Sequence, residues 1–255
     1  MEKYDLLVGN GCSFTEGGGL NNPKIFEFYT KERQVGNNND IFMQENNWVV
    51  YLGNKMKLPY YNLSVSASSN DYVIERAYDF CKDNLGKSIL IINQLTIPER
   101  LSIVKNKKRI TYNGAGKVID ETFYPNLDDD IDVYYKSFIS EVFDYESYWK
   151  DLSMKIDLFD SWCEEKLIKN YWMSWEPIPI KSDKILDFNT KYDKSDKYIG
   201  KVDNIDVNSV RIWSRNQKDK LFLDEVPNIP VKDGHLSIKG HKVITNKLYK
   251  TLIKT

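Results

Sequence analysis

The chain has 255 residues, of which 41% are hydrophobic and 13% are aromatic, so it is long and apolar enough to bury a full core. Its 36 basic and 37 acidic side chains give a formal net charge of −1. This balance excludes a global electrostatic attraction to nucleic acid or to an anionic membrane surface, and it implies no polyanionic substrate.

Strand-like and helix-like patterns alternate along the first 95 residues, which predicts a parallel sheet covered by helices. Ser68 and Asp71 are spaced like a capping box, so we expect a helix to begin there. The stretch "SILIINQL" is a continuous apolar run, typical of a strand buried on both faces. In chain order, the predicted elements are a strand at 6–9, a helix through Trp48, Leu52 and Met56, a strand ending near Leu63, a helix from Ser68 and a strand over 88–95.

The pattern is less regular in the middle of the chain and becomes regular again toward the end. The acidic run at 128–132 is predicted to be a solvated loop. The predicted elements here are a hairpin over 100–116 with its turn at 105–109, a helix burying Trp149, Leu152, Ile156, Phe159 and Cys163, a strand at 170–175 and a last helix at 238–253 burying Ile244, Leu248 and Leu252. We expect one domain over 1–255, with insertions near 18–44, 101–145 and 178–228.

Two stretches far apart in the sequence carry residue types suited to nucleophilic catalysis. Ser13 follows the first predicted strand in the glycine-bracketed segment "LLVGNGCSFTEG". His235 and Asp233 precede the last helix in "VKDGHLSIKGHKVI". A serine nucleophile needs a base, and a histidine oriented by a carboxylate is the usual partner. Because loops at the carboxyl ends of parallel strands converge on one crevice, we expect these three side chains to meet there.

Other interpretations of the same residues stay open. The glycine-rich segment could be a structural or phosphate-binding turn, although it lacks the lysine of a P-loop and the spacing of a dinucleotide site. Cys12 could be the reactive group in place of Ser13, although nothing basic lies near it in the sequence. His241 lies on the apolar stripe of the last helix, so we interpret it as a packing residue.

The segment "GCSFTEG" at 11–17 resembles the first block of the SGNH (GDSL-like) hydrolases, with Cys12 in place of the usual aspartate. It looks particularly like the version in bacteriophage-encoded members. "YNLSVSASSNDYV" is similar to their second block and "DGHLSIKGH" to their last. The resemblance implies a three-layer α/β/α sandwich with a parallel, flavodoxin-like sheet, and it implies Ser13, His235 and Asp233 as the catalytic triad.

The resemblance also implies an oxyanion hole, formed by the backbone N–H of Ser13 and an N–H from the second block. Ala67 stands where that block usually has glycine, and it keeps the N–H if the loop does not need a positive φ. The third block normally presents G-x-N-D after the central strand, and its asparagine side chain is the expected donor. The matching stretch here is "INQLTIPER", in which Asn93 and Thr96 are the candidate side-chain donors.

The function implied is hydrolysis of an ester in a small molecule or a glycan. One such ester would be an O-acetyl group on a carbohydrate. Acyl transfer to another acceptor would use the same residues. The alternative function is not enzymatic. The chain would be a catalytically degraded phage protein that acts as a virion component or binding module, with virion or homo-oligomer contacts. We expect no nucleic-acid partner.

Three scattered cysteines and only two histidines give no metal-ligand spacing, so we expect a reducing compartment, no metal and no cofactor. No apolar stretch approaches the roughly 18 residues of a membrane span, and the first apolar run is too short for a secretory signal. We therefore expect a cytoplasmic protein without membrane contact, located in the host cytoplasm or the virion if it is phage-encoded.

Overall fold

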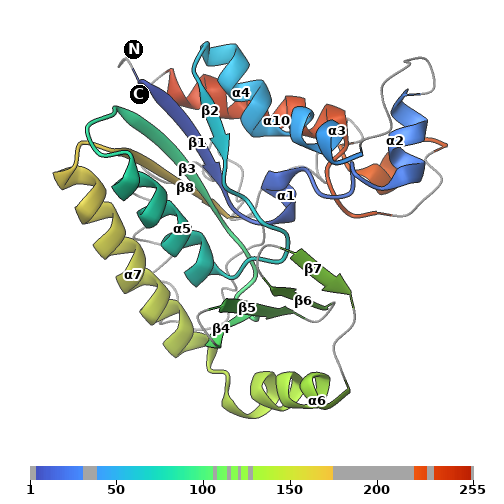
Figure 1. The fold of residues 1–255 in the computed structure, drawn as a ribbon, viewed down its shortest axis with the longest axis vertical. Coiled ribbons are helices and arrows are strands. Elements are labelled where there is room, and N and C mark those ends of the chain that lie inside the picture. The colour runs from blue at the N-terminus through green and yellow to red at the C-terminus, as the bar shows by residue number, and fades with distance from the viewer. Residues whose placement is uncertain are drawn as a thin grey trace.

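The computed structural model describes residues 4–30, 39–105, 108–113, 116–119, 122–125, 129–174, 221–228 and 233–253. A sheet of four parallel strands lies at its centre (Figure 1). The strands are β1 (Leu6–Asn10), β2 (Tyr60–Asn62), β3 (Ile89–Leu95) and β8 (Lys169–Ser174). Their spatial order, β2-β1-β3-β8, is the order of a flavodoxin-like sheet, as predicted.

Helices cover both faces of this sheet. On one face, α5 (Asn70–Asp83) and α7 (Tyr145–Glu165) bury a cluster with Val8, Ile91 and Trp172. On the other face, α4 (Trp48–Met56) and α10 (Ile238–Leu252) pack on Leu7 and Ile92. The three-layer α/β/α sandwich predicted from the sequence is therefore confirmed.

The apolar positions predicted to be buried are buried in the structure. All seven residues of β3 are buried, because helices lie on both sides of the sheet. The helical stripes are also buried, with Trp149, Leu152, Ile156, Phe159 and Cys163 on α7 and Ile244, Leu248 and Leu252 on α10.

The start of α5 differs by one residue from the prediction. Ser69, not Ser68, is the N-cap, and its side chain accepts a hydrogen bond from the N–H of Tyr72. The Ser68 hydroxyl instead donates to the carbonyl of Val65. The capping-box prediction is therefore wrong, because a serine that hydrogen-bonds within the preceding loop is not available to the helix.

The predicted insertions at 18–44 and 101–145 hold regular structure in their described residues. Residues 18–44 contain α2 (Pro23–Thr30) and the first part of α3 (Asn39–Glu45). Residues 101–145 contain an antiparallel sheet in the order β4-β5-β6-β7, then α6 (Asp129–Ser137) and the π-helix η1 (Phe138–Val142). The strands of that sheet are β4 (Leu101–Lys105), β5 (Lys108–Asn113), β6 (Gly116–Ile119) and β7 (Thr122–Pro125).

β4 and β5 form the predicted hairpin, with Lys105 opposite Lys108. The prediction of a loop for the acidic run is wrong, because α6 begins at Asp129. Carboxylates in a first helical turn interact favourably with the positive end of the helix dipole, which explains the difference. Of the third insertion, 178–228, only 221–228 lies within the described residues, and it contains the short 3₁₀ helix η3 (Leu223–Glu225).

Candidate active site

Ser13, His235 and Asp233 lie together at the carboxyl edge of the central sheet. Ser13 begins α1 (Ser13–Glu16), three residues after β1 ends at Asn10. His235 Nε2 is 2.9 Å from Ser13 Oγ, and His235 Nδ1 is 2.6 Å from Asp233 Oδ1. The structure thus brings together three residues that the sequence places in two distant segments, in the serine-to-histidine-to-carboxylate arrangement.

The segment that carries the histidine is held by a short stretch before it. The N–H of Leu223 donates to the carbonyl of His235 at 2.9 Å, and the N–H of Asp224 donates to that of Asp233 at 2.9 Å. Next to them, Phe222 and Leu236 form an antiparallel bridge. Both ends of the Asp233–His235 turn are therefore fixed by backbone hydrogen bonds, which places the imidazole before α10 begins.

Three contacts orient the imidazole of His235. Asp233 Oδ1 accepts both from Nδ1 and, at 2.9 Å, from the backbone N–H of His235. The ring of Phe14 lies against the imidazole, with 4.6 Å between the ring centroids. Burial alone would raise the pKa of Asp233, but the hydrogen bonds and charge of His235 outweigh it and lower that pKa. Asp233 is therefore ionised at neutral pH and favours the tautomer with the proton on Nδ1.

Glycines pack directly against these side chains, and larger residues would not fit. A Cβ at Gly18 would lie 2.8 Å from the Cβ of Ser13, and a Cβ at Gly19 would lie 2.9 Å from Asp233 Oδ2. Gly19 also has a φ of 84°, which side chains disfavour. The glycines around Ser13 predict a tight turn, but this packing was not predicted from them. The run "GGG" at 17–19 is the signal that could have shown it.

Ala67, the predicted second oxyanion donor, lies in the loop between β2 and α5. Its φ is 61°, so the loop does need the left-handed conformation that the sequence analysis set as the condition against alanine. The alanine adopts it at a cost of about 1 kcal/mol. Within the described part of the chain, the N–H groups of Ala67 and Ser13 have no hydrogen-bond acceptor. Buried N–H groups are rarely left unpaired, so both are suited to bind an oxygen of a ligand.

The side chain of Asn93 takes part in a different network, which crosses the sheet. Its Oδ1 accepts from Asn10 Nδ2 and its Nδ2 donates to Asn170 Oδ1, both at 2.8 Å. Asn170 in turn donates to Asp160 at 2.5 Å. These buried amides join β1, β3 and β8 below the candidate site, so the structure does not bring Asn93 to the side of Ser13.

Thr96 and Gln94 follow at the end of β3. The backbone N–H of Thr96 donates to Asn70 Oδ1 at 2.7 Å, and its carbonyl accepts from Asn70 Nδ2 at 3.1 Å, so Asn70 joins the start of α5 to this strand end. Gln94 accepts a hydrogen bond from the hydroxyl of Thr15, which fixes α1 against β3. Sequence reasoning missed the roles of both Asn70 and Gln94.

Cys12, the alternative reactive residue, and His241, the other histidine, are both fully buried. Cys12 has no exposed surface, so no substrate reaches its thiol in this conformation. His241 is also completely buried, in α10, and within the described residues neither ring nitrogen has a hydrogen-bond partner. Burial lowers the pKa of His241 to about 3, with a smaller contribution from His235. His241 is thus a neutral packing residue, as the apolar stripe predicted.

The buried His241 predicts a loss of stability in mild acid. Its folded pKa of about 3 lies below the usual 6.5, so below pH 6.5 the unfolded chain takes up a proton that the folded chain does not. We expect the free energy of unfolding to fall by about 2 kcal/mol between about pH 7.5 and about pH 5 through this group alone. Urea unfolding at both pH values measures it.

A matched pair of variants isolates this effect. His241→Leu should remove that part of the pH dependence, whereas His235→Gln, at the only other histidine, should keep it. An equal pH dependence in wild type and His241→Leu would contradict the assignment.

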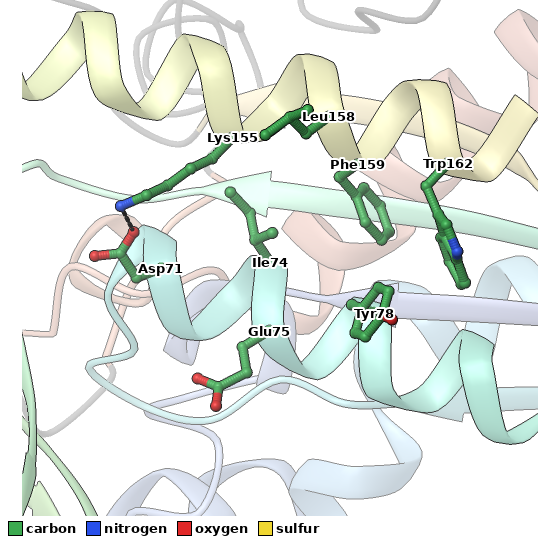
Figure 2. A pocket seen from close by; sticks show the side chains of 8 residues that line it. All are labelled: Asp71, Ile74, Glu75, Tyr78, Lys155, Leu158, Phe159 and Trp162. Atoms are coloured by element: carbon green, nitrogen blue, oxygen red, sulfur yellow. Dashed lines mark hydrogen bonds and ion pairs between the residues drawn. The ribbon is translucent and has the colours of Figure 1, made fainter.

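A groove of about 580 Å³ lies between α5 and α7, on the outer side of the helical layer (Figure 2). Tyr78 and Trp162 face each other at one end, with 4.8 Å between ring centroids, and Lys155 pairs with Asp71 at the other at 2.8 Å. The groove is lined by Asp71, Ile74, Glu75, Tyr78, Lys155, Leu158, Phe159 and Trp162. None of these is a predicted site residue, so the groove is a separate surface feature.

Among the described residues, no group of three His, Cys, Asp or Glu side chains is arranged to hold a metal ion. No helix in the same ranges combines the length and the apolar character needed to cross a membrane.

Comparison with known proteins gives matches only among solved structures. The sequence matches no protein-family model and no curated protein. One similar structure, from Desulfitobacterium hafniense, is assigned to the G-D-S-L family of lipolytic proteins; its TM-score is 0.47 at 13% identity, covering 97% of this chain and 99% of that one. The esterase EstA from a Pseudoalteromonas species has a TM-score of 0.48 at 11% identity, covering 98% and 97%. TesA has a TM-score of 0.45 at 9% identity, covering 97% of each chain.

Proposed function

We propose that this chain is a serine hydrolase that cleaves ester bonds, with Ser13 as nucleophile. The observation that carries the proposal is the continuous hydrogen-bonded series from Ser13 Oγ to His235 Nε2 at 2.9 Å and from His235 Nδ1 to Asp233 Oδ1 at 2.6 Å. Such a series lets the imidazole accept the serine proton while the carboxylate stabilises the imidazolium.

The proposed reaction has two halves. Ser13 Oγ attacks the ester carbonyl as its proton moves to His235 Nε2, and the tetrahedral oxyanion is bound by the N–H groups of Ser13 and Ala67. His235 then gives the proton to the departing alcohol, which leaves an acyl group on Ser13. Water gives a proton to the same nitrogen as it attacks the acyl-enzyme. His235 then returns that proton to Ser13 Oγ as the C–O bond to the serine breaks, which releases the acid and the free serine.

The surroundings of Ser13 favour a small acyl group. Only 8% of the surface of Ser13 is exposed, and Gly18 packs against its Cβ, whereas 27% of the His235 side chain is exposed. The alcohol therefore approaches from the histidine side. We propose acetyl esters as the substrates, with the O-acetyl group of a carbohydrate as the first class to test. Rates on p-nitrophenyl acetate, butyrate and octanoate should fall with acyl length, and a preference for octanoate would contradict a small acyl group.

Labelling with a fluorophosphonate probe tests the proposed chemistry, because this reagent reacts with activated serines. We expect one probe per chain and, after digestion, a mass shift on the peptide that contains Ser13. A folded protein that takes up no probe, or takes it up on another peptide, would overturn the proposal. A hydroxyl acceptor added to the ester assay would separate acyl transfer from hydrolysis, because only transfer gives a new ester.

The second candidate function is a binding module that keeps the scaffold without the activity. Two observations favour it: Asn93 takes part in the network across the sheet, and the groove between α5 and α7 exposes Tyr78 and Leu158, by 38% and 65%. The absence of probe labelling in a folded protein would move the assignment to this candidate.

We also propose a bacteriophage origin, because the segment "GCSFTEG" resembles the version in bacteriophage-encoded members. The chain would then act in the host cytoplasm or in the virion. Immunodetection in purified virions and in the cleared lysate separates the two locations, and absence from both would contradict the proposal.

A further inference from the structure

The loop at 63–69, between β2 and α5, lies directly against the segment that carries Ser13. The N–H of Leu63 donates to the carbonyl of Gly9 at 2.8 Å, and that of Val65 donates to the carbonyl of Gly11 at 3.3 Å. These bonds continue the pairing of β2 with β1 beyond the strand ends. The loop that holds Ala67 therefore takes its position from the serine segment itself.

Glu16, the last residue of α1, makes a further contact with this loop. Its Oε2 accepts a hydrogen bond from the Ser66 hydroxyl at 2.5 Å. Burial raises the pKa of Glu16, and the bonds from Ser66 offset this only in part. A carboxylate is costly to bury, so its contacts with Ser66 define the geometry around it.

Two arginines hold the other side of the same loop. Arg76 Nη2 donates to the carbonyl of Gly11 and to Ser68 Oγ, both at 2.9 Å. Arg100 Nη1 donates to the carbonyl of Ser68 at 3.1 Å. Ala67, with its left-handed backbone, thus lies between two residues that charged side chains fix in place.

We propose that Glu16 is a positioning residue, which holds the Ser66–Ala67 peptide so that the Ala67 N–H is directed at the developing oxyanion. The inference rests on the proposed function and adds a role that the Ser13, His235 and Asp233 arrangement does not need. Because Glu16 follows Ser13 by one helical turn, the same short helix places the nucleophile and the loop that supplies the second donor. The positive charge of Arg76 offsets the negative charge of the Glu16 carboxylate, which would otherwise disfavour the oxyanion.

Three variants test this role. Glu16→Ala removes the acceptor of the Ser66 hydroxyl bond. We expect kcat on p-nitrophenyl acetate to fall about 10-fold to 100-fold with KM changed less than about threefold, because the donor acts mainly in the transition state. Glu16→Gln keeps an acceptor oxygen and should retain kcat within about fivefold. Glu45→Ala removes an exposed carboxylate from the end of α3 and should change neither constant.

Hydrogen exchange followed by mass spectrometry gives a readout that does not need activity. Glu16→Ala should increase exchange in the peptide spanning 63–69 and leave β3 unchanged. In the double variant with Ser66→Ala, the loss in kcat should be smaller than the product of the two single losses, because both remove the same contact.

The outcomes separate the positioning role from the proposed function. Unchanged exchange at 63–69, or a wild-type kcat in Glu16→Ala, would overturn the positioning role while a Ser13-dependent activity still stands. If wild type shows no activity and no probe labelling, the proposed function fails and the oxyanion role of Ala67 with it. Increased exchange together with the fall in kcat supports the inference.

Discussion

Replacing Ser13 with alanine is expected to lower kcat on p-nitrophenyl acetate by about 10⁴ or more, since the acyl-enzyme can no longer form. Fluorophosphonate labelling should disappear in the same variant. The fold should persist, because the side chain removed is small and lies at the edge of the sheet, outside the two clusters that pack on its faces. Steady-state kinetics and the thermal unfolding midpoint measure the two effects.

Ser161→Ala is the matched control for this variant. Ser161 is exposed on α7, and its hydroxyl donates to the carbonyl of Asp157 at 2.8 Å. It should keep wild-type activity and labelling. A Ser13→Ala protein that retained more than about one tenth of the wild-type kcat would contradict a nucleophilic Ser13.

Replacing Asp233 is expected to give two different losses, depending on the substituent. Asp233 Oδ1 accepts both the Nδ1 proton and the backbone N–H of His235. Asp233→Ala removes both bonds and the charge, and we expect kcat to fall about 10³-fold to 10⁴-fold. Asp233→Asn can keep its amide oxygen at the Oδ1 position and lose only the charge, so we expect a fall of about 10-fold to 100-fold.

The decisive measurement is the ratio of kcat in Asp233→Asn to kcat in Asp233→Ala, with Ser161→Ala again as the control. Equal losses in both would show that the amide does not keep its oxygen at the Oδ1 position, and that the tautomer of His235 is lost in either case. A kcat near wild type in Asp233→Ala would remove Asp233 from the mechanism altogether.

The meeting of Ser13 with His235 could be predicted from sequence because parallel sheets impose it. Strand ends in such a sheet share one edge, so residues that follow two of its strands, or precede its last helix, lie near one another whatever their separation in the chain. The same regularity explains why the apolar stripe on α7 and the fully buried β3 were predicted correctly.

Side-chain networks between neighbouring strands could not be predicted in this way. Asn10 and Asn93 hydrogen-bond because the register of β1 and β3 places them side by side, and nothing local to either residue shows that register. The contact between Glu16 and Ser66 depends likewise on how the loop at 63–69 packs on the serine segment. The positive φ of Ala67 is a tertiary effect too, since alanine itself disfavours it.

The separation of 222 residues between Ser13 and His235 has a consequence for synthesis of the protein. The ribosome makes the serine long before the histidine, so the growing chain carries the proposed nucleophile before its proposed base exists. Strand β1, beside Ser13, lies between β2 and β3 in the sheet and can pair with both early. The candidate active site is completed only when the segment that carries His235 has been made. The proposed esterase activity should therefore appear late during translation, after most of the sheet has been made.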